Sequence, residues 1–184
     1  MSDCNKVFCG EPRPRPVNNP SCIQVGLAND TVWIRVEGKG NFQNSTPLKE
    51  FAREMLGRGH RDFVVDLKDC PFMDSTFMGT LASIALKAGG NGQGGLHVVN
   101  LNERTQDLLC NLGLDQLMKL ETPALAEGTE APATEALPGA EGDKALEAKT
   151  MLEAHEAVVQ ANPENEAKFK DVLEFLRQNV NSGQ

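Results

Sequence analysis

The stretch CPFMDSTFMGTLASIALKAGG, from Cys70 to Gly90, decides the fold of this chain. It is mostly apolar, yet Asp74, Ser75 and Thr76 stand together inside it. A protein core accepts such polar groups only when they are hydrogen-bonded. The triplet therefore predicts the start of a helix, where exposed backbone N–H groups need acceptors, or a surface that faces a partner, or both.

The residues that follow the triplet repeat at helical spacing. Phe77, Leu81, Ile84 and Ala88 fall on one side of the predicted helix, and Gly89–Gly90 ends it. Before the triplet, the run FVVDL (63–67) is short and nearly continuous in its apolar residues, as expected for a buried parallel strand.

Strands and helices alternate on both sides of this stretch. Alternating apolar residues predict a strand at 32–36, and further strands are expected at 96–99 and 117–120. A helix is predicted at 46–57, with Thr46 as its cap and Pro47 in its first turn, and another follows Asn102 and ends at Gly113. Short connections between alternating elements imply right-handed crossovers and an α/β fold.

The composition divides the chain into four segments. Residues 1–21 are rich in Pro and Arg without periodicity, which predicts a disordered arm, and 22–120 form the α/β domain. Residues 121–143 hold six acidic residues and no Lys or Arg, which predicts a flexible acidic linker. Residues 144–184 form a C-terminal helical segment.

The C-terminal segment carries two apolar stripes, around Met151–Val159 and Phe169–Val180, separated by Asn162–Glu164. Short helices are marginal alone in water, so each stripe must be buried. Three sites are open: the other helix, the α/β domain, or a second copy or partner. The linker is long enough to reach the surface near Ser75, but we expect a self-packed hairpin or a dimerising helix pair.

Charge and composition exclude several classes of function. A net charge of −8 and a pI near 4.9 argue against non-specific binding to nucleic acid or to anionic membranes. No apolar run approaches the length of a membrane span, and the N-terminal sequence lacks a secretory apolar core, so we expect a cytoplasmic protein. The five cysteines have irregular spacing, which favours reduced thiols.

Motifs for catalysis and for cofactor or metal binding are weak. The run G-x-G-x-x-G at 90–95 lies after a helix and before a strand, the reverse of a dinucleotide site. His155–Glu156 lacks the second histidine of a zinc helix, because position 159 is Val159. A Ser–His–Asp site assembled by folding stays open, although Ser75 lacks the G-x-S-x-G elbow. We expect no enzyme activity, no cofactor and no metal.

These elements together resemble the STAS domain, the fold of bacterial anti-sigma factor antagonists. The resemblance covers about 23–120 and rests on two motifs in matching context: a buried strand leading to D-S-T, and the run NERTQDLLCNLGLDQL (102–117). The chain departs from the family pattern at Phe77, where the family commonly has glycine.

The resemblance implies a phosphorylation switch. In the family, the serine after the aspartate is phosphorylated by a partner anti-sigma factor that is itself a serine kinase, and a phosphatase resets it. By position this serine is Ser75, with Thr76 as the alternative acceptor. A helix N-terminus suits a phosphate, whose charge would weaken an apolar interface. The predicted partner-binding residues are Asp74, Ser75, Thr76, Phe77, Met78 and Thr80.

Two functions are therefore expected from the sequence. The first is a regulator that binds an anti-sigma factor kinase, frees a sigma factor and so controls transcription indirectly. The alternative is a STAS-type accessory subunit that binds a transporter or signalling scaffold without phosphorylation. Either protein could form a homodimer through the C-terminal helices.

Overall fold

A six-stranded mixed sheet forms one layer of the molecule, in the order β5-β4-β3-β2-β1-β6. The structure is a computed structural model and describes residues 21–90, 92, 94–121, 132–138 and 143–182. The strands are β1 (Cys22–Ala28), β2 (Thr31–Glu37), β3 (Asp62–Asp69), β4 (Gly95–Val99), β5 (Lys119–Glu121) and β6 (Glu135–Ala136). β2 to β5 are parallel, while β1 is antiparallel to both β2 and β6.

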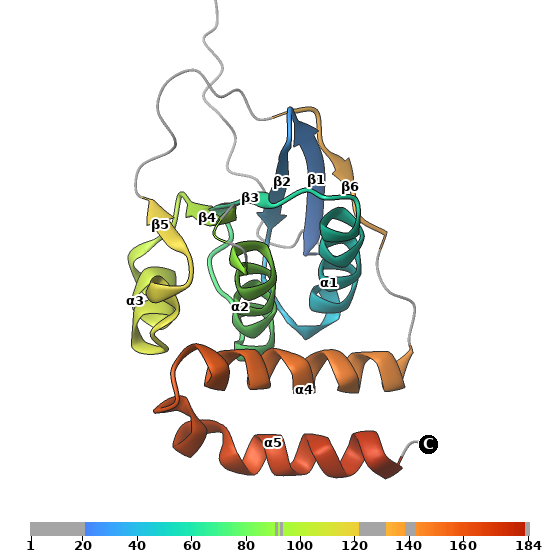
Figure 1. Cartoon of the computed structure of the whole chain (residues 1–184), viewed down its shortest axis with the longest axis vertical. Coiled ribbons are helices and arrows are strands. Elements are labelled where there is room, and N and C mark those ends of the chain that lie inside the picture. Colours follow the sequence, from blue (N-terminus) through green and yellow to red (C-terminus); the bar gives the residue numbers. More distant parts are fainter. Residues whose placement is uncertain (1–20, 91, 93, 122–131, 139–142, 183–184) are drawn as a thin grey trace, which may run out of the picture.

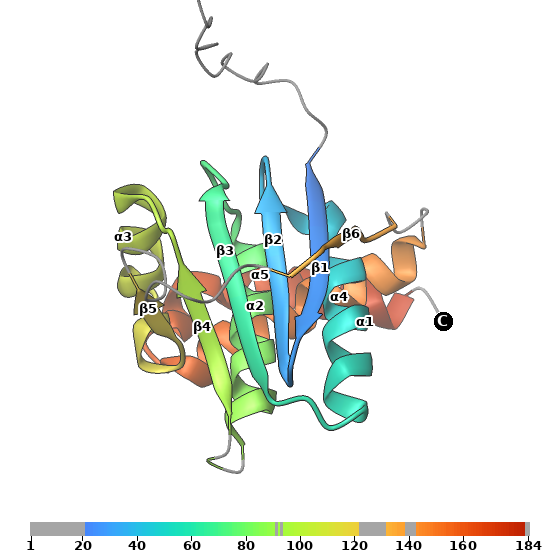
Figure 2. The same ribbon diagram turned by 90° about the horizontal axis from the view of Figure 1, so that it is seen from above.

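The helices lie on one side of this sheet in successive layers (Figures 1 and 2). They are α1 (Phe42–Gly57), α2 (Ser75–Gly89), α3 (Glu103–Asn111), α4 (Lys144–Ala161) and α5 (Asn165–Ser182), and a short 3₁₀ helix spans Leu114–Gln116. α1 and α2 cover the sheet, α4 lies across them, and α5 lies outside α4 (Figure 1). The α/β prediction with a C-terminal helical segment is confirmed.

The main core lies between the sheet and α1 and α2. Alternation along β2 turns Val32, Ile34 and Val36 into this core, where each is fully buried, and α2 contributes Phe77 and Leu81. Each such side chain stabilises the fold by about 1.5–3 kcal/mol relative to an exposed position. The spacing that predicted α2 therefore also places its apolar face.

The start of α1 differs from the prediction. The helix begins at Phe42, four residues before Thr46, because Asn41 forms a capping box with Asn44. Pro47 consequently lies inside the helix, and Thr46 is buried within it instead of capping it. The last strand of the parallel set also begins later than expected, because the 3₁₀ helix occupies 114–116.

Part of the predicted acidic linker lies along the sheet. β6 pairs with β1, and the Leu137 N–H donates to the Ile23 carbonyl at 2.8 Å. Gly26 permits this approach, because a Cβ there would lie 2.7 Å from the Ala133 carbonyl oxygen. The prediction of a linker that is flexible throughout 121–143 is therefore wrong for 132–138. The predicted arm at 1–21 falls almost entirely outside the described residues, as do 122–131 and 139–142.

Candidate functional site

Asp74 joins the N-terminal ends of two helices. It is the N-cap of α2, where its Oδ1 accepts from the Phe77 N–H at 2.8 Å. Its Oδ2 accepts from the Phe42 N–H, the first of α1, at 2.9 Å. Its own N–H donates to the Gly40 carbonyl at 2.9 Å. The carboxylate therefore satisfies backbone donors of both helices and fixes the position of Ser75.

Ser75, the first residue of α2, is half-buried and contacts a histidine from the C-terminal segment. Its Oγ lies 3.1 Å from His155 Nε2, and His155 Nδ1 lies 2.8 Å from the Met151 carbonyl oxygen. A carbonyl only accepts, so Nδ1 carries a proton, and in the neutral imidazole Nε2 accepts from the Ser75 hydroxyl. The ring of Phe169 on α5 packs edge-on against His155, with the ring centroids 5.2 Å apart.

α4 approaches α2 most closely one turn beyond Ser75. A Cβ added to Gly79 would lie 2.2 Å from the Ala154 carbonyl oxygen, so only glycine permits this crossing. Ser83 lies one further turn along α2 and lines a small hollow together with Glu153 and Ala157 of α4. Small side chains at intervals of four residues on α2 therefore form the groove in which α4 lies.

Polar contacts fasten the α4–α5 hairpin (residues 143–182) to the domain at the middle of α4 and at the turn between the helices. Lys49 Nζ of α1 lies 2.7 Å from Glu153 Oε2 of α4. At the turn of the hairpin, the fully buried Asn165 side chain donates to the carbonyls of Leu112 and Val158, at 2.8 and 3.2 Å. The two helices pack on each other, as a self-packed hairpin predicts, and α4 also packs on the domain, because it lies between α5 and α2.

The other predicted partner-binding residues are buried in this arrangement. Phe77 is fully buried in the main core, against Gly40, and Met78 belongs to the same core. Thr76 and Thr80 are also buried, and the Thr80 hydroxyl donates to the Thr76 carbonyl at 2.9 Å. The inclusion of Phe77 in a partner surface is wrong, because its helical position turns its side chain toward the sheet.

Ser75 and His155 do not complete a catalytic triad with Asp74. His155 Nδ1 donates to a backbone carbonyl, while both carboxylate oxygens of Asp74 accept from backbone N–H groups. No carboxylate therefore orients this imidazole in the manner of a Ser–His–Asp site. Among the described residues, no three His, Cys, Asp or Glu side chains come together in a way that could hold a metal ion.

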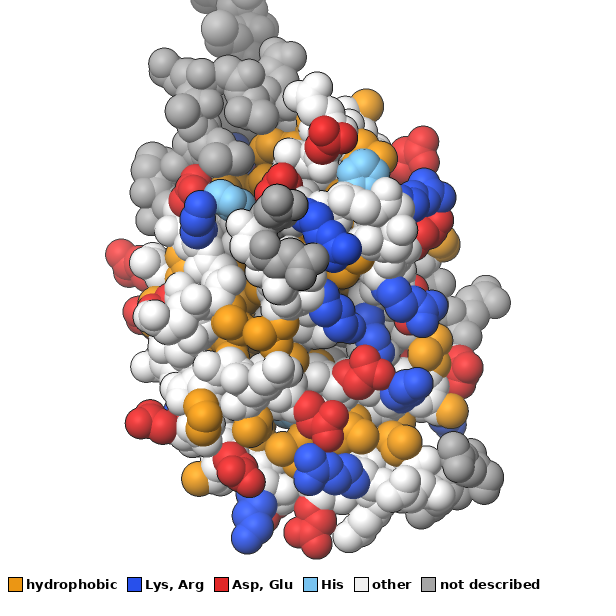
Figure 3. Space-filling model, viewed as in Figure 1, with side chains coloured by type: hydrophobic (Ala, Val, Ile, Leu, Met, Phe, Trp, Pro, Cys, Tyr) orange, Lys and Arg blue, Asp and Glu red, His pale blue; other side chains and the backbone are white. Residues whose placement is uncertain are grey.

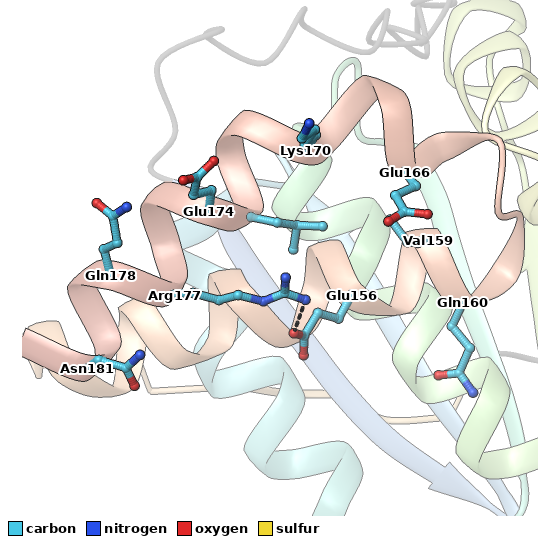
Figure 4. A pocket seen from close by; sticks show the side chains of 10 residues that line it. Glu156, Val159, Gln160, Glu166, Lys170, Glu174, Arg177, Gln178 and Asn181 are labelled. Atoms are coloured by element: carbon cyan, nitrogen blue, oxygen red, sulfur yellow. Dashed lines mark hydrogen bonds and ion pairs between the residues drawn. The ribbon is translucent and has the colours of Figure 1, made fainter.

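Another hollow lies between α4 and α5 (Figure 4). Its walls carry Val159 and Leu173, and an ion pair of 3.1 Å joins Glu156 to Arg177 across it. Figure 4 shows several charged and amide side chains around its edge. This hollow is separate from Ser75, which lies beneath α4.

Exposed aromatic side chains lie next to the Asp74 cap. Phe42 and Phe72 are about a third exposed, at 38% and 36%, and the Arg104 guanidinium lies 5.5 Å from the centre of the Phe72 ring. The loop before α1 and the loop before α2 are adjacent, because the Gly40 N–H donates to the Phe72 carbonyl at 3.0 Å. Burial raises the pKa of the neighbouring Cys70 thiol, while Cys110 is exposed.

Sequence reasoning missed His155, Gly79 and Ala154 as parts of this site. His155 is 80 residues from Ser75, and the two signals at that position, an apolar stripe and an incomplete zinc motif, do not indicate a contact with Ser75. The spacing of Ser75, Gly79 and Ser83 was a usable signal, because small residues four apart permit close helix packing. This spacing indicates that another helix crosses α2, but it does not identify α4 as that helix.

Comparison with known proteins gives the family. The family model described as "Mlab, STAS domain" matches residues 23–121, which is more than half of the chain. An anti-sigma factor antagonist from Mycobacterium paratuberculosis is similar in structure, at 20% identity and a TM-score of 0.50 over 58% of this chain and 88% of that one. SpoIIAA in its phosphorylated form, a Bacillus cell fate determinant, is similar at 17% identity and a TM-score of 0.47 over 54% and 91%.

The sheet, the capped helix α2 and the family match define a STAS-type α/β domain. The chain belongs to the STAS domain family. The match ends at residue 121, so the α4–α5 hairpin lies outside the matched region. No helix in the described parts of the chain is both long enough and apolar enough to cross a membrane.

Proposed function

We propose that this protein is a phosphorylation-switched regulator that binds an anti-sigma factor with serine kinase activity, and that Ser75 is the switch. One observation carries the proposal: in a STAS domain, a hydroxyl stands in the first turn of α2, positioned by the Asp74 cap. The backbone N–H groups of this turn and the helix dipole favour a phosphate there. The M. paratuberculosis protein of the same fold is described as an anti-sigma factor antagonist.

Ser75 is a better acceptor than Thr76 in this arrangement. Ser75 is half-buried, whereas Thr76 is only 6% exposed. Phosphorylation of Ser75 would add about −1.5 to −2 charge next to the Asp74 carboxylate, at a surface that also exposes the Phe42 and Phe72 rings. The chain acts through binding alone in this proposal, controls transcription indirectly, and is reset by a phosphatase.

The surface available to a partner differs from the one expected from sequence alone. Phe42 and Phe72 expose apolar area beside Asp74, and Arg104 adds a cation above one of the rings. Exposed aromatic and arginine side chains are enriched where partners bind. We propose Asp74, Phe42 and Phe72 as the accessible contact, with Ser75, Thr76, Met78 and Thr80 reached only after α4 moves.

A second candidate is an accessory subunit that binds a transporter or scaffold without phosphorylation. The observation that favours it is the bond between Ser75 and His155, which engages the hydroxyl beneath α4. In this case Ser75 would be a structural residue of the hairpin interface, and the exposed aromatic surface would be occupied constitutively.

The test uses protein isolated from its native cell. Mass spectrometry should find phosphate on Ser75, with none after Ser75→Ala, while Thr76→Ala retains it. In quantitative co-purification, Ser75→Ala should keep the kinase partner and Ser75→Glu should lose it. A loss of 3–4 kcal/mol in binding corresponds to about two to three decades in affinity. Unmodified Ser75 and equal binding by both variants would support the accessory-subunit alternative.

A further inference from the structure

We infer that the α4–α5 hairpin is an intramolecular ligand of the α2 surface, and that a partner helix must displace it to reach Ser75. The role assigned to Ser75 rests on the proposed function. The docking itself rests on contacts between described residues that are independent of that function.

The groove along α2 is shaped for a helix. Gly79 allows the backbone of α4 to approach so closely that a Cβ would be 2.2 Å from the Ala154 oxygen. Ser75 at one end offers a hydroxyl to His155, and Ser83 continues the line of small residues at the other. An external ligand for this groove is therefore an amphipathic helix with a small side chain at the crossing, as α4 has Ala154.

The domain can exist without the hairpin in place, because its core is nearly complete without it. The main hydrophobic core draws its buried residues from 23–118, with Ala157 as the single buried contribution from α4. Release of α4 would also expose Ala154 and Val158, which are 2% and 0% exposed, but the large side chains Phe63, Phe77 and Leu81 belong to the core that residues 23–118 form. Release of α4 is therefore a local opening and leaves the folded sheet intact.

The interface between α4 and the domain includes polar contacts that water can replace when α4 is released. It contains the Ser75–His155 hydrogen bond and the Lys49–Glu153 ion pair, whose groups water solvates well after release. The buried hydroxyl of Thr150 on α4 has no protein partner among the described residues. This unpaired hydroxyl lowers the stability of the docked state.

The surface of the molecule is consistent with a hairpin that covers α2. In Figure 3 hydrophobic side chains form a band along the hairpin, while Lys and Arg side chains gather over α1 beside it. On α5, Val172 and Phe175 are exposed, at 41% and 62%. The hairpin thus presents apolar side chains outward while α4 occupies the α2 groove.

The docking is tested in the full-length chain by replacing Ser75 with a thiol. Ser75→Cys is pulsed with N-ethylmaleimide, and labelling is read at each cysteine by mass spectrometry. Cys110 is exposed and serves as the fast standard, and Cys70 is buried and serves as the slow standard that reports an intact core. Position 75 should label at least about tenfold more slowly than Cys110.

Variants designed to release α4 from α2 are compared with matched control variants, also on α4. Ala154→Leu and Ala154→Glu place a bulky or a charged side chain against Gly79, whereas Ala145→Leu and Ala145→Glu place them at an exposed position. The Ala154 variants should raise labelling at position 75 about tenfold with Cys70 still protected, and the Ala145 variants should not.

Three outcomes overturn the inference. The first is labelling of position 75 at the Cys110 rate before any opening variant is introduced. The second is unchanged labelling in both Ala154 variants. The third is loss of Cys70 protection in both, which would make the hairpin an integral part of the domain fold.

Native phosphorylation separates this inference from the proposed function. In the native cell, Ala154→Leu should raise phosphate occupancy at Ser75 severalfold over the parent chain and over Ala145→Leu. One possible result is that the Ala154 variants increase thiol labelling at position 75, while no variant that keeps Ser75 carries phosphate. This result would support the docking and reject the phosphorylation switch. Phosphate at equal occupancy in all variants would support the switch and reject the competition.

Discussion

At the scale of single residues, Asp74 has a larger structural role than its position in the sequence suggested. The sequence indicated that Asp74 and Ser75 begin a helix, and Asp74 is its N-cap. The second acceptor role, toward the Phe42 N–H of α1, could not be predicted, because it depends on how two loops meet in space. The exposed Asp143 offers a comparison, since it caps α4 alone.

Replacement of the two aspartates should therefore have unequal effects. Asp74→Ala leaves backbone donors of two helices without acceptors and should lower the free energy of unfolding by about 2–3 kcal/mol. Asp143→Ala should cost about 1 kcal/mol or less, and only in α4. Trp33, the single tryptophan, lies in the sheet on the face away from the main core, so its fluorescence in urea reports the domain. Equal midpoints for the two variants would contradict the double-cap interpretation.

His155 shows the limit of reasoning from single residues. Its position on an apolar stripe fits a core histidine, and nothing local indicates that its acceptor nitrogen meets Ser75. Phe77 shows the opposite case. Its spacing with Leu81 and Ile84 already favoured burial, and the structure places it in the main core.

At the scale of elements, the helices and strands of the domain follow closely from periodicity and turn residues. There are three exceptions: β1 was not predicted as a strand, α1 begins early at the Asn41 capping box, and the 3₁₀ helix delays β5. β6 could not be predicted, because a two-residue strand has no detectable period and forms only by pairing with β1. The path of α4 across α2 depends on Gly79, whose significance appears only when the second helix is present.

A single methyl group at this crossing should move α4. Gly79→Ala introduces a Cβ that would lie 2.2 Å from the Ala154 oxygen, so α4 must shift, at a cost of about 1–3 kcal/mol in docking. Gly89→Ala is the matched control, because it lies in the same helix and a Cβ there meets nothing within 4 Å. This control should stabilise α2 by up to about 1 kcal/mol.

Amide hydrogen exchange measures this difference. Gly79→Ala should speed exchange throughout α4 and leave β3 protected, while Gly89→Ala should leave α4 unchanged. If α4 exchanges equally slowly in both variants, the close crossing at Gly79 does not hold the hairpin in place.

At the scale of the whole molecule, the sequence predicted the α/β class and the helical character of the C-terminal segment, but not where that segment lies. Apolar stripes require burial and leave the burial site open. The contacts that settle the site, such as Asn165 with Leu112, join residues more than 50 positions apart. The family match stops before them.

Nucleotide binding provides a test of the whole chain. The glycine run at 90–95 follows α2 and precedes β4, so it lacks the strand-then-helix context of a phosphate loop. ATP with Mg²⁺ should therefore leave the melting temperature unchanged. A ligand at about one hundred times its Kd would add about 2.7 kcal/mol of stability, which calorimetry detects readily. A clear nucleotide-dependent rise would show that the chain binds nucleotide itself.

The pairing of β6 with β1 sets the effective concentration of the hairpin at its own docking site. With β6 in place, four residues, 139–142, connect Pro138 to Asp143, whereas 21 residues, 122–142, connect β5 to Asp143 once β6 is free. A longer connection lowers the effective concentration of a tethered segment, so release of β6 should lower that of the hairpin. A ligand at the remote edge strand could thus lower the threshold for a competing helix without contacting α2.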